Sequence, residues 1–228
     1  MLENLFKRII TSTILLLLLL FITLIHQYIF ISAILLLGLI ICFEANNIFF
    51  KIMSFKNLKE KSTKKISSKF LILNIITFCY VFFVFCNSAY EIHKYQSPIY
   101  FLYVISICFF TDIGGYFFGN FFGGKKLSKI SPNKTISGSI GSFIFSLIPF
   151  IIILNTNYLN LQLNLKNVGF CLILSLISQL GDLFLSFLKR KAKVKDTGKI
   201  LPGHGGVLDR VDGIIFAVPF SYFLLNLI

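Results

Sequence analysis

The sequence predicts an all-α, polytopic transmembrane helix bundle of about seven spans, and two observations support this prediction. The first is composition: 56% of the 228 residues are hydrophobic and only 14% are charged, whereas a soluble domain is roughly 45–50% apolar and about 25% charged. Because so few polar side chains cannot cover a water-soluble globule, the apolar surface must face lipid. The second is a series of long apolar runs that recurs along the whole chain.

Each apolar run is a candidate membrane span, because a spanning helix needs ~20 mostly apolar residues. The seven candidates cover approximately residues 9–25, 29–43, 70–87, 98–111, 138–154, 168–185 and 213–228. The first run follows Lys7 and Arg8, as the apolar core of a signal peptide does. It is longer than such a core and no small-x-small cleavage site follows it, so we expect it to be a retained first span.

The apolar segment 113–124 is rich in glycine and leaves two interpretations open. It is either an eighth, broken span or a re-entrant piece that lines a cavity without crossing the membrane. With seven spans and a cytoplasmic N-terminus, 20 of the 22 Lys and Arg residues lie inside, and only Lys94 and Lys166 lie outside. This distribution follows the positive-inside rule. One additional complete span would move the last basic loop outside, so the charges argue against it.

The chain divides into an N-terminal transmembrane region, 1–97, with a basic, Lys- and Ser-rich cytoplasmic loop at 51–69, and a C-terminal region, 98–228, that carries the chemistry. The formal charge of +13 indicates, in a membrane protein, contact with anionic lipid headgroups rather than with nucleic acid. The five cysteines all lie in apolar runs and none belongs to a C-x-x-C pair. They are interpreted as buried free thiols.

The aspartates gather at or beside the predicted cytoplasmic loops. Asp182 lies in an otherwise apolar helix end, where an ionised carboxylate costs roughly 3 kcal/mol and usually faces the bundle interior with a partner or an ion. Asp182, Ser186 and Lys189 follow i, i+4, i+7 spacing and therefore share one helix face. Asp209 and Asp212 follow i, i+3 spacing, which places them on one face of the next helix. Carboxylates beside cations suit Mg²⁺ and phosphate oxygens.

Two basic, glycine-containing loops lie near these acids. One runs from Lys195 to Gly206, and the other includes Gly123-Gly124-Lys125-Lys126 and Ser131-Pro132-Asn133-Lys134-Thr135. Glycines let consecutive N–H groups form an anion-binding nest, and Lys and Arg add positive charge for phosphate. Both loops therefore indicate a polyanionic ligand.

Residues 186–212 resemble the signature of the phosphatidate cytidylyltransferases, also called CDP-diacylglycerol synthases. The pattern is S-x-x-K-R-x-x-x-x-K-D-x-G followed by P-x-H-G-G-x-x-D-R-x-D, and here it runs from Ser186 to Asp212. Upstream, Asp112–Tyr116 resembles the family's D-x-G-A-Y, Ser131–Thr135 its S-P-x-K-T, and Gln179–Leu183 its Q-x-G-D-L. The chain departs from the family at Ser137 and Leu185, where relatives usually have Glu.

The resemblance implies the reaction CTP plus phosphatidate giving CDP-diacylglycerol and pyrophosphate, in phospholipid biosynthesis, with Mg²⁺ as cofactor. It also implies a multi-pass protein of the bacterial inner membrane, with the active site facing the cytoplasm, membrane lipid as a partner and a homodimer as the assembly. The implied metal ligands are Asp182, Asp209 and Asp212. The implied catalytic and phosphate-binding residues are Ser186, Lys189, Arg190, Lys195, Asp196, His204 and Arg210. The implied substrate-binding residues are Asp112, Ser131, Lys134, Thr135, Gly205 and Gly206.

Two alternatives stay open from residue chemistry. A cytidylyl- or phosphotransferase acting on an isoprenoid lipid phosphate would need the same charged groups and an equally apolar groove. A transporter or channel for an anionic solute would also contain intramembrane charges and a glycine-broken segment. Charges clustered on one side of the membrane, and the lack of a recognisable inverted repeat in the sequence, argue against transport.

Overall fold

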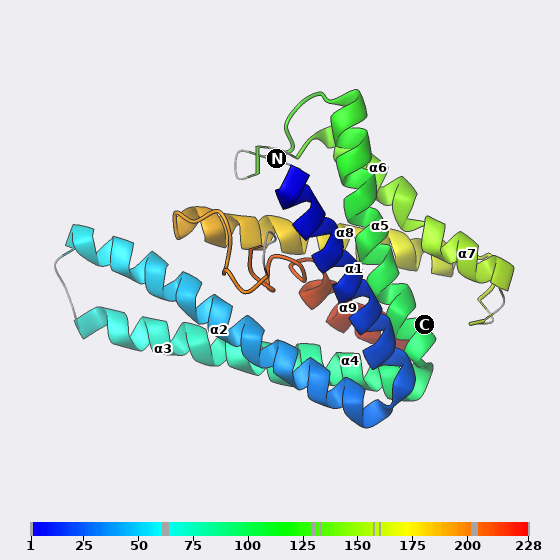
Figure 1. The fold of residues 1–228 in the computed structure, drawn as a ribbon, viewed down its shortest axis with the longest axis horizontal. Helices are drawn as coiled ribbons and strands as arrows, with labels where there is room; N and C mark the ends of the chain where they lie inside the picture. The colour runs from blue at the N-terminus through cyan, green and yellow to red at the C-terminus, as the bar shows by residue number, and fades with distance from the viewer. Residues whose placement is uncertain are drawn as a thin grey trace. The chain divides into compact units, whose positions relative to one another are not determined.

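The computed structural model describes residues 2–60, 64–128, 131–132, 134–156, 158–159, 161–201 and 205–227. These residues form helices joined by turns (Figure 1), with no strand among them and only two isolated β-bridges. The fold class is therefore confirmed as all-α. The elements in chain order are α1 (Leu2–Ile25), α2 (Gln27–Glu60), α3 (Lys64–Cys79), η1 (Tyr80–Cys86), α4 (Asn87–Glu91), η2 (Ile92–Gln96), α5 (Pro98–Phe122), α6 (Ile136–Ser146), α7 (Ile148–Thr156), α8 (Leu165–Lys191) and α9 (Ile214–Leu227).

Apolar helices account for all seven predicted spans. Five stretches in the described part of the chain are long and apolar enough to cross a membrane: Gln27–Ser54, Ser68–Gln96, Pro98–Phe122, Ile136–Thr156 and Leu165–Lys191. Two shorter apolar stretches, Thr13–Ile25 and Ile214–Asn226, correspond to the first and last predicted spans. A polytopic membrane protein is thus confirmed, while the number of spans that cross stays a prediction.

The chain forms two compact units. Unit 1 comprises Met1–Asn87 and Phe187–Val211, and unit 2 comprises Ser88–Ser186 and Asp212–Ile228. The boundary between them passes through α8, so the residues of the predicted signature are divided between the units.

In unit 1, α2 and α3 lie side by side, and α1 contacts α2 (Figure 1). The buried side chains of this unit include Phe30 and Ile41 of α2 and Phe85 of η1. The prediction of a loop over 51–69 was wrong for most of its length, because α2 continues to Glu60 and α3 begins at Lys64. The segment contains no Gly or Pro and is rich in Lys, a good helix former, so its polar character does not stop the helices.

In unit 2, glycines bring α5 and α6 into close contact. A Cβ on Gly114 would lie 2.6 Å from Phe145 Cβ, and one on Gly138 would lie 2.7 Å from the carbonyl oxygen of Gly115. A Cβ on Gly141 would overlap the Phe118 side chain. Small residues at such positions let two membrane helices pack backbone against backbone.

The interpretation of segment 113–124 as a separate broken or re-entrant piece was wrong. Residues 98–122 form the single continuous helix α5. Ser97 caps its first turn by accepting a hydrogen bond from Tyr100 N at 2.9 Å, and Gly123 ends it with a φ of 57°, a conformation that favours glycine. The glycines inside α5 therefore serve helix contact, and the break comes only at Gly123.

We predict that Gly114→Ala will destabilise the protein by about 1–3 kcal/mol, the usual cost of an extra methyl group in a filled contact. The measurement is thermal unfolding of the purified protein in detergent. Gly169→Ala in α8 is the matched control, since a Cβ there meets nothing within 4 Å and Ala favours a helix over Gly by up to ~1 kcal/mol. Equal unfolding temperatures for Gly114→Ala and the control would contradict the close α5–α6 contact.

Candidate active site

The segment that follows α8 in unit 1 folds back on itself in a series of turns. Lys193 N and Val194 N donate to the last carbonyl groups of α8, and Lys193 adopts a φ of 53° that turns the chain. Leu201 and Gly205 exchange hydrogen bonds, N to O, of 2.9 and 3.2 Å. We call residues 192–211 the signature loop.

Asp209 lies at the centre of the signature loop. Its Oδ1 accepts a hydrogen bond from Lys189 Nζ at 2.8 Å. Its Oδ2 accepts from Thr197 N at 2.7 Å, from Thr197 Oγ1 at 3.0 Å and from Gly206 N at 3.0 Å. Burial raises the pKa of this carboxyl, but the hydrogen bonds and charge of Lys189 and the two backbone N–H groups outweigh burial and hold the pKa below its usual range. Asp209 is therefore an ionised organiser of the loop.

Glu44 of α2 is a second carboxylate in the same loop, and the sequence reasoning missed it. The residue is 1% exposed. Its Oε1 accepts from Val207 N at 3.0 Å, and its Oε2 accepts from Leu208 N at 2.8 Å and from Thr197 Oγ1 at 2.9 Å. A signal was present in the sequence, because Glu44 directly follows an apolar run and an acid in that setting usually has an inward-facing role.

The two carboxylates occupy the anion-binding nest that the glycines were predicted to form. Three consecutive N–H groups, those of Gly206, Val207 and Leu208, donate to Asp209 or Glu44. Gly205 N donates to the carbonyl of Leu201. The anions bound by this backbone in the structure are thus the protein's own.

The basic side chains of the signature loop are exposed, whereas the two carboxylates that hold the loop are buried. Lys195 and Asp196 are exposed, as are Arg190 at the end of α8 and Arg210. Lys189 is largely buried because it pairs with Asp209. His204 lies outside the described residues. The loop therefore combines a buried carboxylate frame with an exposed, mainly basic surface.

Unit 2 contains a second group of predicted residues around Asp182. Lys134 forms an ion pair with Asp182 Oδ2, and Ser186 Oγ lies 3.3 Å from Asp182 Oδ1. The Lys134 and Asp182 side chains are 28% and 24% exposed, so the pair can be reached by solvent. As predicted, Asp182, Ser186 and Lys189 all belong to one helix, α8.

The segment around Ser131–Thr135 positions Lys134. Lys134 N donates to Ser131 O at 3.1 Å, and Lys134 O accepts from Leu127 N at 2.8 Å. Thr135 caps α6 by accepting from Gly138 N at 3.0 Å. Ser137 hydrogen-bonds Thr135 Oγ1 and donates to the Gly123 carbonyl. Ser137 thus ties the two ends of this basic loop together.

The prediction that Asp209 and Asp212 share a helix face was wrong. Residues 206–213 form turns, and α9 begins only at Ile214. Arg210 N donates to Val207 O in a turn, and the helical hydrogen bonds of α9 begin with Ala217 N to Gly213 O. Asp212 belongs to unit 2, where its Oδ1 accepts from Gly213 N at 2.9 Å. Asp112 is an exposed residue of α5.

The carboxylates have the right chemistry for Mg²⁺, but Asp209 is poorly placed to bind it as the loop stands. Among the described residues no group of three or more His, Cys, Asp or Glu side chains could hold a metal ion. Asp209 already accepts hydrogen bonds from Lys189 Nζ, Thr197 N and Gly206 N, and it shares the single hydroxyl hydrogen of Thr197 with Glu44. Asp182 is more exposed, and its Oδ2 pairs with Lys134.

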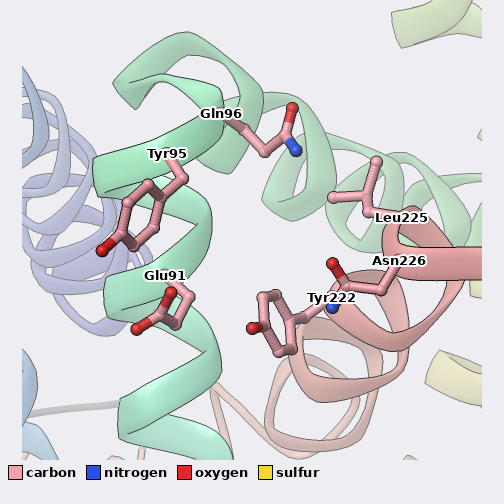
Figure 2. Close-up of a pocket in the computed structure, with 6 residues that line it drawn as sticks. All are labelled: Glu91, Tyr95, Gln96, Tyr222, Leu225 and Asn226. Atoms are coloured by element: carbon pink, nitrogen blue, oxygen red, sulfur yellow. The ribbon is translucent and has the colours of Figure 1, made fainter.

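A pocket of about 270 Å³ lies elsewhere in unit 2, away from the predicted residues. Figure 2 shows Glu91 and Tyr95 on one side and Tyr222 and Asn226 of α9 on the other. The remaining lining residues are Gln96 and Leu225. None of the predicted site residues contributes to it, so it is not the candidate active site.

Comparison with known proteins identifies the family. The model of the cytidylyltransferase family matches residues 41–228, a range that includes Glu44 and both groups described above. The phosphatidate cytidylyltransferase of Staphylococcus aureus (strain COL) is 48% identical over 127 residues, which is 55% of this chain and 48% of the relative. The enzyme of the same name from Bacillus subtilis (strain 168) is 46% identical over 132 residues, 56% of this chain and 48% of the relative.

The chain spans about half the length of the curated relatives it matches. The match to the family model covers more than half of this chain, from the middle of α2 to the last residue. The expected family is therefore confirmed, and the chain belongs to the cytidylyltransferase family.

Proposed function

We propose that this chain transfers a cytidylyl group from CTP to phosphatidate and so makes CDP-diacylglycerol in phospholipid biosynthesis. A phosphate oxygen of phosphatidate attacks the α-phosphorus of CTP, the bond between the α-phosphorus and its bridging oxygen breaks, and pyrophosphate leaves with that oxygen. Membership of the family and the names of the relatives support this reaction. No nucleic acid takes part.

The observation that carries the proposal is the signature loop, with its carboxylates inside and its cations outside. Transfer between two polyanions depends on positioning and on neutralising charge. The exposed Lys195, Arg190 and Arg210 suit phosphate oxygens, and Arg can bind them bidentately. Buried Glu44 and Asp209 fix the backbone that carries two of these side chains.

Residues of unit 2 have roles of the same kind in the proposal. Lys134 would bind a phosphate of CTP or of the lipid, and its pairing with Asp182 keeps its ammonium oriented until then. Ser131 and Thr135 hold the backbone on either side of Lys134. Ser186 and Asp112 would contact the substrates. The acyl chains of phosphatidate would stay among the apolar helices.

Mg²⁺ belongs to the proposal as well. The candidate ligands are Asp182 and Asp212 in unit 2 and Asp209 in unit 1, whose carboxylate oxygens are the type of ligand that Mg²⁺ prefers. The ion would neutralise charge on the leaving pyrophosphate. Binding at Asp209 would require the carboxylate to give up its hydrogen bond with Lys189. We further propose a bacterial inner-membrane protein, a site that faces the cytoplasm and a homodimer.

We expect the purified, lipid-reconstituted protein to form a CDP-lipid and pyrophosphate from labelled CTP and phosphatidate in the presence of Mg²⁺. An isoprenyl phosphate is the comparison substrate, and thin-layer chromatography of the labelled lipid is the readout. If only the isoprenyl phosphate yields labelled product, the acceptor is an isoprenyl phosphate and not phosphatidate. A folded protein that forms no labelled lipid from either acceptor would refute the proposal, and solute uptake by the same liposomes would then test transport.

Lys189→Met should lower turnover by about 100-fold, because an Asp209 carboxylate without its cation no longer holds the signature loop in place, and a displacement of ~1 Å can cost that much in rate. The Lys189 and Asp209 side chains are 14% and 7% exposed, so water replaces little of the lost interaction. Lys166→Met is the matched control, since Lys166 is an exposed residue near the opposite end of the same helix. Similar turnover in both variants would show that the ion pair is dispensable.

Asp182→Asn should raise the Mg²⁺ concentration needed for half-maximal turnover by more than about tenfold. Mutating a residue that only hydrogen-bonds a metal ligand already lowers metal affinity by about 10- to 100-fold, and a ligand itself should matter at least as much. The measurement is a Mg²⁺ titration of CDP-lipid formation at saturating CTP. Glu91→Gln in the separate pocket of unit 2 is the control. A titration midpoint equal to that of the wild type would remove Asp182 from the ligand set.

A further inference from the structure

Glu44 stands out because it comes from a helix that carries none of the predicted motifs. It belongs to α2, whereas its three hydrogen-bond donors, Thr197, Val207 and Leu208, belong to the signature loop of the same compact unit. The residue is 1% exposed. A buried carboxylate is retained only where donors satisfy it, and here every recorded donor lies in the loop.

The contacts fix the loop at both ends. Thr197 directly follows exposed Asp196 and Lys195, while Val207 and Leu208 precede Asp209 and Arg210. One carboxylate that binds both segments therefore sets their separation. The Thr197 hydroxyl reaches both Glu44 Oε2, at 2.9 Å, and Asp209 Oδ2, at 3.0 Å, so it joins the two acids.

Two motif glycines are explained by the same side chain. A Cβ on Gly198 would overlap Glu44 Oε1. A Cβ on Gly206 would overlap the Thr197 hydroxyl and lie 2.5 Å from Glu44 Oε2. Gly198 and Gly206 both have backbone angles outside the left-handed region that favours glycine. Both positions therefore require glycine because the Glu44 carboxylate and the Thr197 hydroxyl fill the space that a Cβ would occupy.

We propose that Glu44 is a positioning residue for the phosphate-binding surface of the signature loop. Its carboxylate holds Thr197 and residues 206–208, and thereby holds Lys195 and Arg210 at the separation that the triphosphate of CTP requires. The inference rests on the proposed function for its substrate. It extends the functional site to α2, a helix that precedes every sequence motif.

Glu44→Gln tests the inference with little change of shape. A glutamine oxygen can replace one carboxylate oxygen, but its NH₂ group cannot accept from Leu208 N, which leaves a buried donor unsatisfied. We expect faster deuterium exchange at the amides of residues 205–211. We also expect the KM for CTP to rise roughly tenfold or more, with a smaller change in kcat. Glu91→Gln is the matched control and should change neither quantity.

A second pair of variants keeps the test decisive if Glu44→Gln folds poorly. Thr197→Val preserves shape but removes the hydroxyl that binds Glu44, so it should reproduce faster exchange and the higher KM. Thr197→Ser keeps the donor and should restore both toward the wild type. A role in folding alone would instead reduce the yield of folded protein and leave the KM of the folded fraction unchanged.

The outcomes separate this inference from the proposed function. Wild-type exchange and wild-type KM in both Glu44→Gln and Thr197→Val would overturn the role of Glu44. A reduced yield with an unchanged KM for CTP would overturn it as well. If the wild type itself forms no CDP-lipid, the proposed function fails, and unchanged exchange in the variants would then also refute the loop contact.

Discussion

The shape of the signature loop depends on hydrogen bonds from its backbone N–H groups to two buried carboxylates. Glu44 and Asp209 accept hydrogen bonds from the N–H groups of Thr197 and of residues 206–208. Because those N–H groups are satisfied by acids from inside, the chain there needs neither helix nor sheet. The basic side chains are left on the outer surface. A loop with little regular structure thus acquires one defined shape.

Much of this arrangement could be predicted from local sequence. Apolar run length predicts the helices, since a span needs a minimum number of apolar residues whatever surrounds it. The spacing of Asp182, Ser186 and Lys189 predicts a shared helix, and α8 contains all three. The basic loops were also predicted correctly as the segments that connect α5 to α6 and α8 to α9.

The remaining features depend on contacts between distant residues. Glu44 meets Val207 and Leu208 across 163 and 164 positions of sequence, so no local pattern reveals the partner. The meaning of the glycines at 114–119 was ambiguous in the sequence, because glycine suits both a broken span and a close helix contact. In the structure they permit close contact between α5 and α6. Turns at 206–213 stand where a helix was predicted, and the N–H groups of residues 206–208 donate to Asp209 and to Glu44 of distant α2.

The position of Glu44 along α2 bears on the level at which this loop would meet a lipid bilayer. The helix has 34 residues, about 51 Å at 1.5 Å per residue, whereas the hydrocarbon core is ~30 Å thick. Glu44 comes 17 residues after Gln27, or about 26 Å along the axis. In a helix that runs along the bilayer normal and enters the hydrocarbon at Gln27, this carboxylate would lie near the level at which acyl chains give way to headgroups. A lipid phosphate at that level would meet the loop without its acyl chains leaving the bilayer.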